Sequence, residues 1–280
     1  MAQHYAKDVL VTTDWLAARL GDDGQVVAEV DENTDLYEEG HIPGAVKLHW
    51  QDDLQDALER DLVEQPQFEE LMGARGIGND TTVILYGDKN NWFAAYAYWY
   101  LKIYGHQDVR LIDGGRQKWI DEGRELSTDA PSISPASYSA TPRDESIRVY
   151  RDTVLSELGA DGIALVDVRS PQEYSGELMA PPGYEQEGAS RTGHIPGAQS
   201  IPWAQAVRDD GTFKSADELR ELYSGKGITG DQEVRVYCRI GERSAHTWFV
   251  LRELLGYENV KNYDGSWTEW GNLVGVPIQR

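Results

Sequence analysis

The hexapeptide Gly40-His41-Ile42-Pro43-Gly44-Ala45 recurs as Gly193-His194-Ile195-Pro196-Gly197-Ala198, and a tryptophan follows each copy at the same distance. Two further matches come in the same order along the chain. The segment VILY at 83–86 matches VRVY at 234–237, and the Asp-Gly pair at 113–114 matches the one at 264–265. Three ordered matches at a nearly constant offset indicate that the chain is a duplication.

The duplication divides the 280 residues into two domains of similar length, and each half is long enough to bury its own core. We expect an N-terminal domain at 1–126 and a C-terminal domain at 147–280. Residues 127–146 are rich in Ser, Pro and Ala, without a periodic apolar pattern, and predict an extended linker. Helical and strand patterns alternate in both halves, so we predict an α/β fold in which helices flank a mainly parallel sheet in each domain.

The expected elements occur in the same order in both halves. Each half has a short helix (14–20, 151–158), a strand (26–30, 164–168), the repeated turn, a second helix (68–74, 216–223), a second strand (82–86, 233–237), a long helix (92–104, 245–255) and a short strand that ends at Asp-Gly.

The charge is strongly acidic, at −22, and the acidic residues are spread along the chain. Such a surface repels nucleic acid and anionic membranes, so we expect neither as a partner. Adaptation to high salt is one hypothesis for this surface, and a melting temperature that did not rise with salt would contradict it. The N-terminus has no apolar signal core, and Lys102 interrupts the longest apolar stretch, which predicts a cytoplasmic protein.

The only cysteine is Cys238. A lone cysteine excludes an intramolecular disulfide, a cysteine-based zinc site and dithiol redox chemistry. It is either an inert buried residue or a nucleophile that works alone. The predicted strand 233–237 and the following helix place Cys238 at the carboxyl end of a strand, the edge at which α/β sheets form their sites.

Several features around Cys238 predict an anion-binding loop. The backbone N–H groups at the start of the next helix carry partial positive charge, and Arg239 and Arg243 add two guanidinium groups. We expect these groups to lower the pKa of Cys238 well below ~8.5. Gly241 permits the positive φ that a tight loop requires.

The repeated turn, the six-residue loop Cys238 to Arg243 and the segment Asp-Gly-Ser-Trp at 264–267 resemble those of the rhodanese family, over essentially the whole chain. The loop is similar to that of two-domain thiosulfate sulfurtransferases, which reads Cys-Arg-x-Gly-x-Arg-Ser. The resemblance implies a persulfide on Cys238, thiosulfate as donor, cyanide or another thiophile as acceptor, and no metal or other cofactor. It also implies a set of substrate-binding residues: Arg239, Ile240, Gly241, Glu242, Arg243, Ser244 and Arg191. The role of Glu242 among them stays open, because a glutamate there can also serve only to hold an arginine. Arg191 precedes the second turn, at the end of an insertion at 175–192.

The N-terminal half offers an internal control. It has Gly87 at the position of Cys238, and Asp88 to Trp92 replace Arg239 to Arg243. We therefore expect this half to be catalytically silent. His41 and His194 occur in both halves, although only one half has a nucleophile, so we interpret them as structural residues of the turn. His246 has no histidine counterpart, and its role stays open.

Three other functions compete with thiosulfate transfer. A 3-mercaptopyruvate sulfurtransferase is the first, although enzymes with that preference tend to have small neutral residues after the cysteine, where this chain has Arg239. A cysteine phosphatase is less compatible, because its loop places five residues between Cys and Arg and this loop has four. The third is a non-catalytic sulfur-carrier or interaction module, in which the aromatic helix at 92–104 could contribute to binding. We expect that helix to serve core and interdomain packing.

Overall fold

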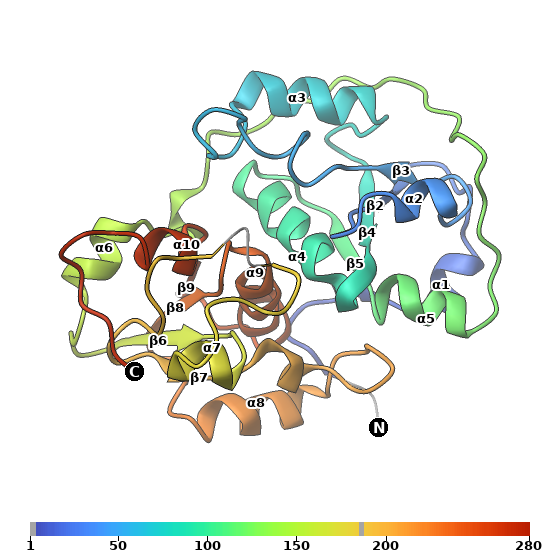
Figure 1. Cartoon of the computed structure of the whole chain (residues 1–280). Coiled ribbons are helices and arrows are strands. Elements are labelled where there is room, and N and C mark those ends of the chain that lie inside the picture. The colour runs from blue at the N-terminus through green and yellow to red at the C-terminus, as the bar shows by residue number, and fades with distance from the viewer. Residues whose placement is uncertain (1–3, 185–187) are drawn as a thin grey trace. The chain divides into compact units, whose positions relative to one another are not determined.

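The computed structural model describes residues 4–184 and 188–280, which form two compact units (Figure 1). The N-terminal unit comprises Val9–Asp144 with Asp209–Phe213, and the C-terminal unit comprises Glu145–Arg208 and Lys214–Arg280. The described residues before Val9 belong to the C-terminal unit, which differs from the predicted boundary. The Ala6 N–H donates to the Leu254 carbonyl at 2.8 Å, and Lys7 forms an ion pair with Glu253 at 2.8 Å.

The N-terminal unit contains a five-stranded sheet in the order β1-β5-β4-β2-β3, in which every pair is parallel. The strands are β1 (Leu10–Val11), β2 (Gln25–Glu29), β3 (Val46–Lys47), β4 (Thr82–Tyr86) and β5 (Val109–Ile112). The helices are α1 (Thr13–Ala17), α2 (Leu36–Glu39), α3 (Gln65–Ala74), α4 (Asp88–Ile103) and α5 (Gly115–Asp121).

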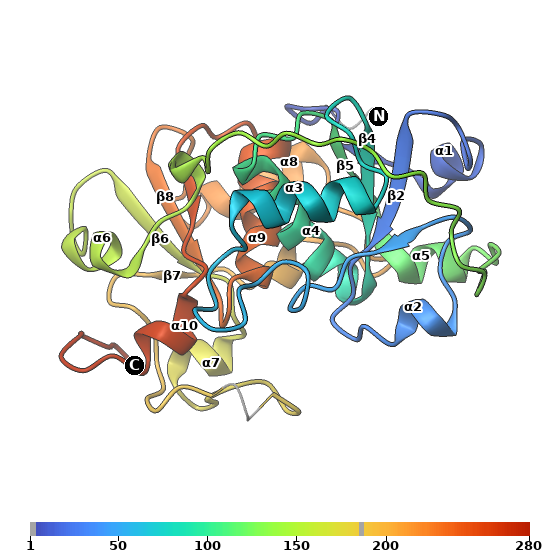
Figure 2. The same ribbon diagram turned by 90° about the horizontal axis from the view of Figure 1, so that it is seen from above.

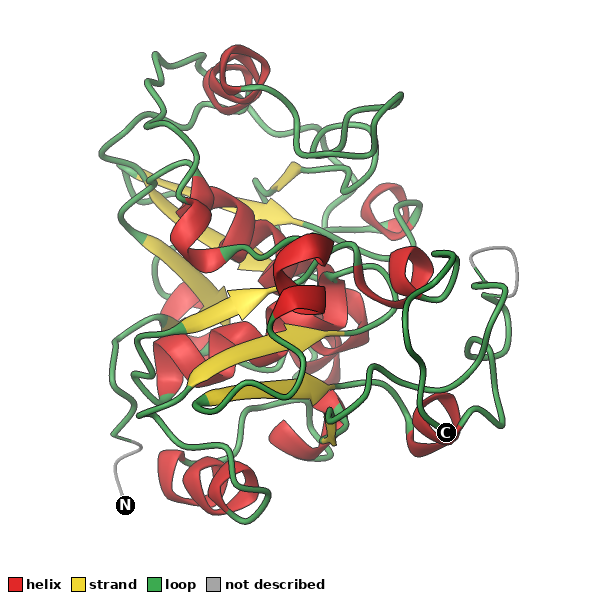
Figure 3. Cartoon of the chain, turned by 90° about the vertical axis from the view of Figure 1, so that its left-hand side faces the viewer, coloured by secondary structure: helices red, strands yellow, loops and turns green. Residues whose placement is uncertain are grey.

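The C-terminal unit contains a four-stranded parallel sheet in the order β7-β6-β8-β9. The strands are β6 (Ile163–Asp167), β7 (Gln199–Ser200), β8 (Glu233–Tyr237) and β9 (Val260–Asn262). The helical elements are η1 (Glu145–Ile147), α6 (Arg151–Ser156), α7 (Pro171–Ser175), η3 (Trp203–Ala206), α8 (Ala216–Ser224), α9 (Glu242–Phe249), the π-helical turn η4 (Val250–Leu254) and α10 (Ser266–Trp270). Figure 3 shows helices around the strands of each sheet.

The predicted α/β fold class is confirmed, and the two strands that precede Gly87 and Cys238 have the predicted bounds. Both are interior strands whose last four residues are buried. All but one of these side chains are apolar or aromatic, and the exception, Arg235, is paired with Glu157 and Glu233. The long helices begin earlier than predicted. Helix α4 begins at Asp88 with three residues of left-handed backbone, Lys89 to Asn91, and α9 begins at Glu242.

The segment between α5 and η1 is extended over most of its length and passes along α3 (Figure 2). The Ala136 N–H donates to the Gly73 carbonyl at 2.9 Å, and Ser139 exchanges hydrogen bonds with Asn79 at 2.8 and 3.0 Å. Glycine is required at position 73, because a Cβ there would lie 2.6 Å from the Ala136 carbonyl oxygen. These contacts tie the segment to the N-terminal unit up to Asp144.

The repeated turn is fixed in the same way in both units. A tyrosine at the end of the central strand accepts a hydrogen bond from the turn, Tyr86 from the Ile42 N–H at 2.8 Å and Tyr237 from the Ile195 N–H at 3.1 Å. His41 stacks on a tyrosine ring at 4.0 Å and bonds two carbonyl oxygens, and His194 stacks at 3.6 Å and bonds one. The structural interpretation of both histidines is confirmed.

None of the helices in the described part of the chain combines the length and hydrophobicity that a bilayer crossing requires.

Candidate active site

Cys238 directly follows β8, and Gly241 is the N-cap of α9, so the two residues bound a tight strand-to-helix loop. Gly241 has φ +104°, and a Cβ at this position would lie 2.9 Å from the Asp264 Cα. Both the backbone conformation and the space therefore require glycine. The sequence prediction of a glycine-dependent loop at the carboxyl edge of the sheet is confirmed.

The carbonyl groups of the loop are turned outward, toward the segment 262–268. The Cys238 carbonyl accepts from the Trp267 N–H at 3.1 Å, and the Arg239 carbonyl accepts from the Thr268 N–H at 3.0 Å and hydroxyl at 2.7 Å. The Asn262 amide donates to the Gly241 carbonyl at 3.1 Å. Because these carbonyls are bound on the outside, the loop can direct N–H groups to its inside, where the sulfur lies.

Ser266 is a positioning residue that the sequence analysis did not identify. Its hydroxyl accepts from the Cys238 N–H at 3.1 Å and donates to the Tyr263 carbonyl at 2.7 Å. Ser266 has φ +52°, which is unusual for a residue with a side chain. Ser266 belongs to the Asp-Gly-Ser-Trp segment that the sequence singled out, but the contact between its hydroxyl and the loop depends on the tertiary fold.

The Cys238 side chain is fully buried, with polar neighbours at Gly241 in the loop and in the first turn of α9. It accepts from the Gly241 N–H at 3.1 Å, and it lies 3.6 Å from the Ser244 hydroxyl and 3.6 Å from Glu242 Oε2. Burial raises the pKa of the Cys238 thiol and the Glu242 carboxylate raises it further, whereas Arg243 and the bonds from Ser244 lower it. The net direction is upward, so the predicted low pKa is wrong. Desolvation and a carboxylate outweigh the positive groups.

The Arg243 guanidinium is engaged by a carboxylate on another helix. Its Nη1 and Nη2 donate to the two oxygens of Glu173 at 3.0 and 3.1 Å, and both side chains are buried. Glu173 also accepts from the Ser170 N–H at 3.0 Å, in a capping box that starts α7. Arg243 therefore adds positive charge near the sulfur from a fixed position. The sequence analysis missed Glu173, although the Ser170-x-x-Glu173 pattern was visible.

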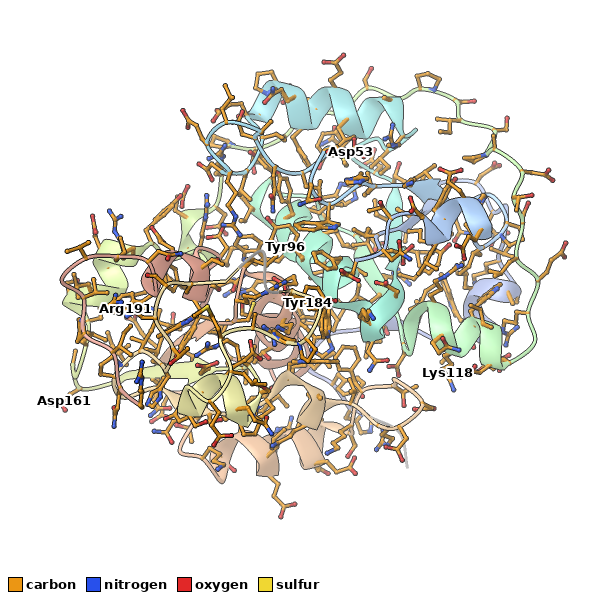
Figure 4. The ribbon with its side chains drawn as sticks, in the orientation of Figure 1. Asp53, Tyr96, Lys118, Asp161, Tyr184 and Arg191 are labelled. Carbon is orange, nitrogen blue, oxygen red and sulfur yellow. The ribbon has the colours of Figure 1, made fainter. Side chains whose placement is uncertain are left out.

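Arg239 lies against the insertion that precedes the second turn. Its guanidinium carbon is 4.5 Å from the centre of the Tyr184 ring, and Nη1 donates to the Tyr184 carbonyl at 3.4 Å. Figure 4 labels Tyr184, the last described residue before the gap in this insertion. Arg239 and its neighbour Ile240 are both buried. The residues 185–187 of this insertion lie outside the described part of the chain.

The structure gives Arg191 a different role from the predicted substrate contact. Its guanidinium donates to four backbone carbonyls at the end of the chain, those of Trp270, Gly271, Leu273 and Val276, at 2.5–3.2 Å. It lies beside α10 (Figure 4). All three guanidinium nitrogens take part, so Arg191 ties together the end of α10 and the segment that follows it. Arg191 is therefore a structural clamp, and we do not include it in the site.

His246 is fully buried on α9 and makes an edge-to-face contact with Trp203, with ring centroids 5.4 Å apart. Burial lowers the pKa of His246 to about 3, so the ring stays neutral. In the described ranges, no group of three or more His, Cys, Asp or Glu side chains could hold a metal ion.

The N-terminal unit has no space for a nucleophile at the equivalent position. Gly87 follows β4 as Cys238 follows β8, but a Cβ on Gly87 would overlap the Val30 carbonyl. Asn91, the counterpart of Glu242, fills the loop: its side chain accepts from the Gly87 N–H at 3.0 Å and donates to the Ile112 carbonyl at 2.8 Å.

The charges behind this loop also differ between the units. Glu29 lies opposite Tyr86 in the register of β2 and β4, and Asp167 lies opposite Tyr237 in the register of β6 and β8. Two residues later, the N-terminal unit has Asp31 and the C-terminal unit has Arg169, which forms a buried ion pair with Asp167. The N-terminal unit thus has an acid, Asp31, where the C-terminal unit has Arg169, and its Glu29 forms an ion pair with the buried Arg116 at 3.1 Å instead.

A family model described as the rhodanese-like domain matches residues 12–122 and 151–273. The chain belongs to the rhodanese family. The two matched segments are the two copies of the duplication, so both copies have the rhodanese-like fold, and only the second has the cysteine.

Related rhodanese-family proteins cover nearly the whole chain. It is 61% identical to "Sulfur carrier protein TtuD" of Thermus thermophilus, over 98% of this chain and 97% of the relative. It is 58% identical to "Putative thiosulfate sulfurtransferase" of Saccharopolyspora erythraea, over 98% of this chain and 96% of the relative. A protein of the same name from Haloferax volcanii is 55% identical, over 99% of this chain and 98% of the relative.

Among solved structures, the chain is similar to EanB with a persulfide on its cysteine and ergothioneine. The TM-score is 0.83 and the identity is 25%, over 96% of this chain and 70% of that chain. EanB in complex with hercynine has a TM-score of 0.84 at 26% identity, over 96% of this chain and 68% of that chain. The family and these names support sulfur transfer as the general activity.

Proposed function

We propose that the chain is a thiosulfate sulfurtransferase that carries sulfane sulfur as a persulfide on Cys238. The observation that carries this proposal is the surroundings of the sulfur. Cys238 Sγ lies at the carboxyl end of β8 and accepts the Gly241 N–H at 3.1 Å. A fixed N–H directed at the sulfur stabilises negative charge on it, which both a thiolate and a persulfide carry.

The reaction proceeds in two half-reactions. The Cys238 thiolate attacks the outer sulfur of thiosulfate, a new S–S bond forms, and the S–S bond of thiosulfate breaks so that sulfite leaves with the electron pair. A thiophile such as cyanide then attacks the outer sulfur of the persulfide and leaves as thiocyanate, which regenerates the thiolate. This is covalent catalysis with ping-pong kinetics, and the protein needs no further cofactor.

Two arginines supply the positive charge that a dianionic donor requires. Arg243 acts through the position in which Glu173 holds it, and Arg239 is the cation next to Cys238 in the loop. We assign the sulfonate oxygens of thiosulfate to Arg239, with Ile240, Gly241 and Ser244 as the remaining walls of the loop. The C-terminal unit, which contains Cys238, is then the catalytic domain, and the N-terminal unit, with Gly87 at the equivalent position, is a silent domain.

The comparisons support this chemistry and also favour a second candidate. EanB, which has the same fold, is described with a persulfide on its cysteine. The Thermus relative is named a sulfur carrier, so delivery of sulfur to another protein is the second candidate. Both candidates load Cys238 in the same way and differ in the acceptor.

The test is thiocyanate formation from thiosulfate and cyanide, measured for the wild type and for Cys238→Ser at low and high salt. We expect activity in the wild type and none in the variant, with a mass increase of one sulfur atom on the wild type after thiosulfate alone. Loading without thiocyanate formation would favour the sulfur carrier. Turnover that is faster with 3-mercaptopyruvate than with thiosulfate would reject thiosulfate as donor, and activity retained in Cys238→Ser would reject the persulfide.

A further inference from the structure

The Glu242 carboxylate is buried against the catalytic sulfur. Glu242 opens α9 directly after the N-cap Gly241, and 2% of its surface is exposed. Its Oε2 lies 3.6 Å from Cys238 Sγ, a distance at which a thiol donates to a carboxylate. The residues are four positions apart, so the contact is built into the loop and the first helical turn.

The sulfur needs a group that takes its proton. The nucleophile is the thiolate, but the pKa of the Cys238 thiol is raised, so the resting sulfur carries a proton. Among its polar contacts from the described residues, the Gly241 N–H donates a hydrogen bond at 3.1 Å. The Ser244 hydroxyl lies 3.6 Å from the sulfur and shares its single proton with the Gly241 carbonyl, 3.0 Å away, so it is not a base for the thiol. The contact with Glu242 runs in the opposite direction, from the thiol to an acceptor.

The other charged groups around the loop come from several elements and are paired. On α9, Arg243 Nε lies 3.9 Å from Glu242 Oε1, while the rest of its guanidinium binds Glu173 on α7. Next to Gly241, Asp264 forms two hydrogen bonds with Arg148 at 3.0 and 3.1 Å. Arg239 lies on Tyr184. Arg243 thus partly offsets the charge of Glu242, which remains an acceptor for the thiol.

We propose that Glu242 is a catalytic residue that takes the proton of Cys238 and later returns it. This inference rests on the proposed function. In the first half-reaction the S–H bond breaks and an O–H bond forms on Glu242, while the thiolate attacks the outer sulfur of thiosulfate and sulfite leaves with the electron pair. In the second, the acceptor takes the outer sulfur, the thiolate departs, and Glu242 gives the proton back.

This role predicts a specific dependence on pH. Transfer between Cys238 and Glu242 changes no proton count, so the rate of sulfite release in a single turnover stays nearly constant from about pH 6 to about pH 8. In Glu242→Gln the thiolate forms only by loss of a proton to water. The rate of this variant falls about tenfold for each pH unit below the pKa of its thiol. Glu253→Gln, a buried carboxylate of η4 that pairs with Lys7, is the matched control and keeps the wild-type profile.

A purely electrostatic role of Glu242 predicts the opposite result. Removing its charge would then lower the thiol pKa, and Glu242→Gln would be faster than the wild type at pH 6. That outcome, or a profile parallel to the wild type, overturns the proposal. If Glu242→Gln does not fold, Glu242→Asp is measured instead. This variant retains a base, so its rate of sulfite release should be lower than that of the wild type but equally independent of pH. A tenfold fall in its rate per pH unit would overturn the proposal.

Alkylation by iodoacetamide, followed by mass spectrometry, separates the two proposals. The rate of alkylation depends on the same proton transfer and requires no sulfur donor. An alkylation rate that is independent of pH in the wild type but rises with pH in Glu242→Gln would support Glu242 as the base, even if thiosulfate proved inactive. Parallel alkylation profiles alongside active sulfur transfer would overturn the role of Glu242 and leave the proposed function intact.

Discussion

Asp31→Asn is expected to remove a pH dependence of stability that originates in the N-terminal unit. Asp31 is 3% exposed and lies beside Glu29, which is 1% exposed. Burial raises the pKa of Asp31 to about 9, and the hydrogen bond and charge of Glu29 act in the same direction. Asp31 therefore holds a proton in the folded chain at neutral pH. Asparagine donates a similar hydrogen bond without titrating.

The magnitude follows from the difference between the folded and unfolded states. Asp31 has a pKa of about 9 when folded and its ordinary value of 3.8 when unfolded. Between these values the folded chain binds one more proton, so the free energy of unfolding falls by up to about 1.4 kcal/mol per pH unit. The contribution is complete below pH 3.8 and is lost as the pH rises to about 9. From pH 6 to pH 8 the loss amounts to about 3 kcal/mol.

The assay is urea unfolding at several pH values from 5 to 9, for the wild type, Asp31→Asn and the exposed control Asp22→Asn. The wild type and the control should lose stability with pH more steeply than Asp31→Asn, which should become the most stable of the three at pH 8. If the free energy of unfolding changed with pH in parallel for the wild type and Asp31→Asn, the raised pKa of Asp31 would be refuted.

Three further substitutions test the positioning of the site. Glu173→Gln leaves the Arg243 charge buried without its partner and should cost about 3–5 kcal/mol in urea unfolding. Gly241→Ala forces a side chain onto a positive φ and against Asp264, and it should reduce sulfur transfer on the order of 10²-fold by moving the N–H from the sulfur. Gly87→Cys in a Cys238→Ser background should not restore sulfur transfer and should lower the melting temperature, because the Cβ overlaps a carbonyl.

Each of these has a control within the chain. Glu177→Gln changes an exposed glutamate and should leave stability unchanged, so equal losses at 173 and 177 would contradict the buried pair. Gly227→Ala adds a side chain at φ +76° in open space, so it isolates the backbone strain. Equal activity losses at 227 and 241 would indicate global destabilisation. Sulfur loading at position 87 of the double variant would show that the first repeat accommodates a nucleophile.

The fold and the position of Cys238 at a strand end could be predicted from the sequence because their signals are local and repeated. The β-branched and aromatic residues at 82–86 and 233–237 predict two strands, and the structure has both strands with these bounds. Gly241 sits between a strand and a helix, which identifies a loop that needs positive φ. The duplication added a comparison within one chain, and it identified His41 and His194 as structural.

The electrostatics of the site could not be predicted in the same way. Arg239 and Arg243 indicate positive charge, but the chain order does not show that Glu173 binds one of them or that the sulfur is fully buried. Arg191 was misassigned because its four carbonyl partners come from the end of the chain, about 80 residues away. Desolvation depends on the packed structure, so the direction of the Cys238 pKa was predicted wrongly.

The obstruction at Gly87 has an evolutionary consequence. The first repeat is separated from a working site by the course of its backbone past the Val30 carbonyl, and by an asparagine that has filled the loop. One codon change to cysteine would meet a backbone that has no place for it, so several coordinated changes would be needed before selection could act. The first repeat is free to diverge for stability or surface properties, while under the proposed function a single atom of the second repeat, Cys238 Sγ, carries the sulfur.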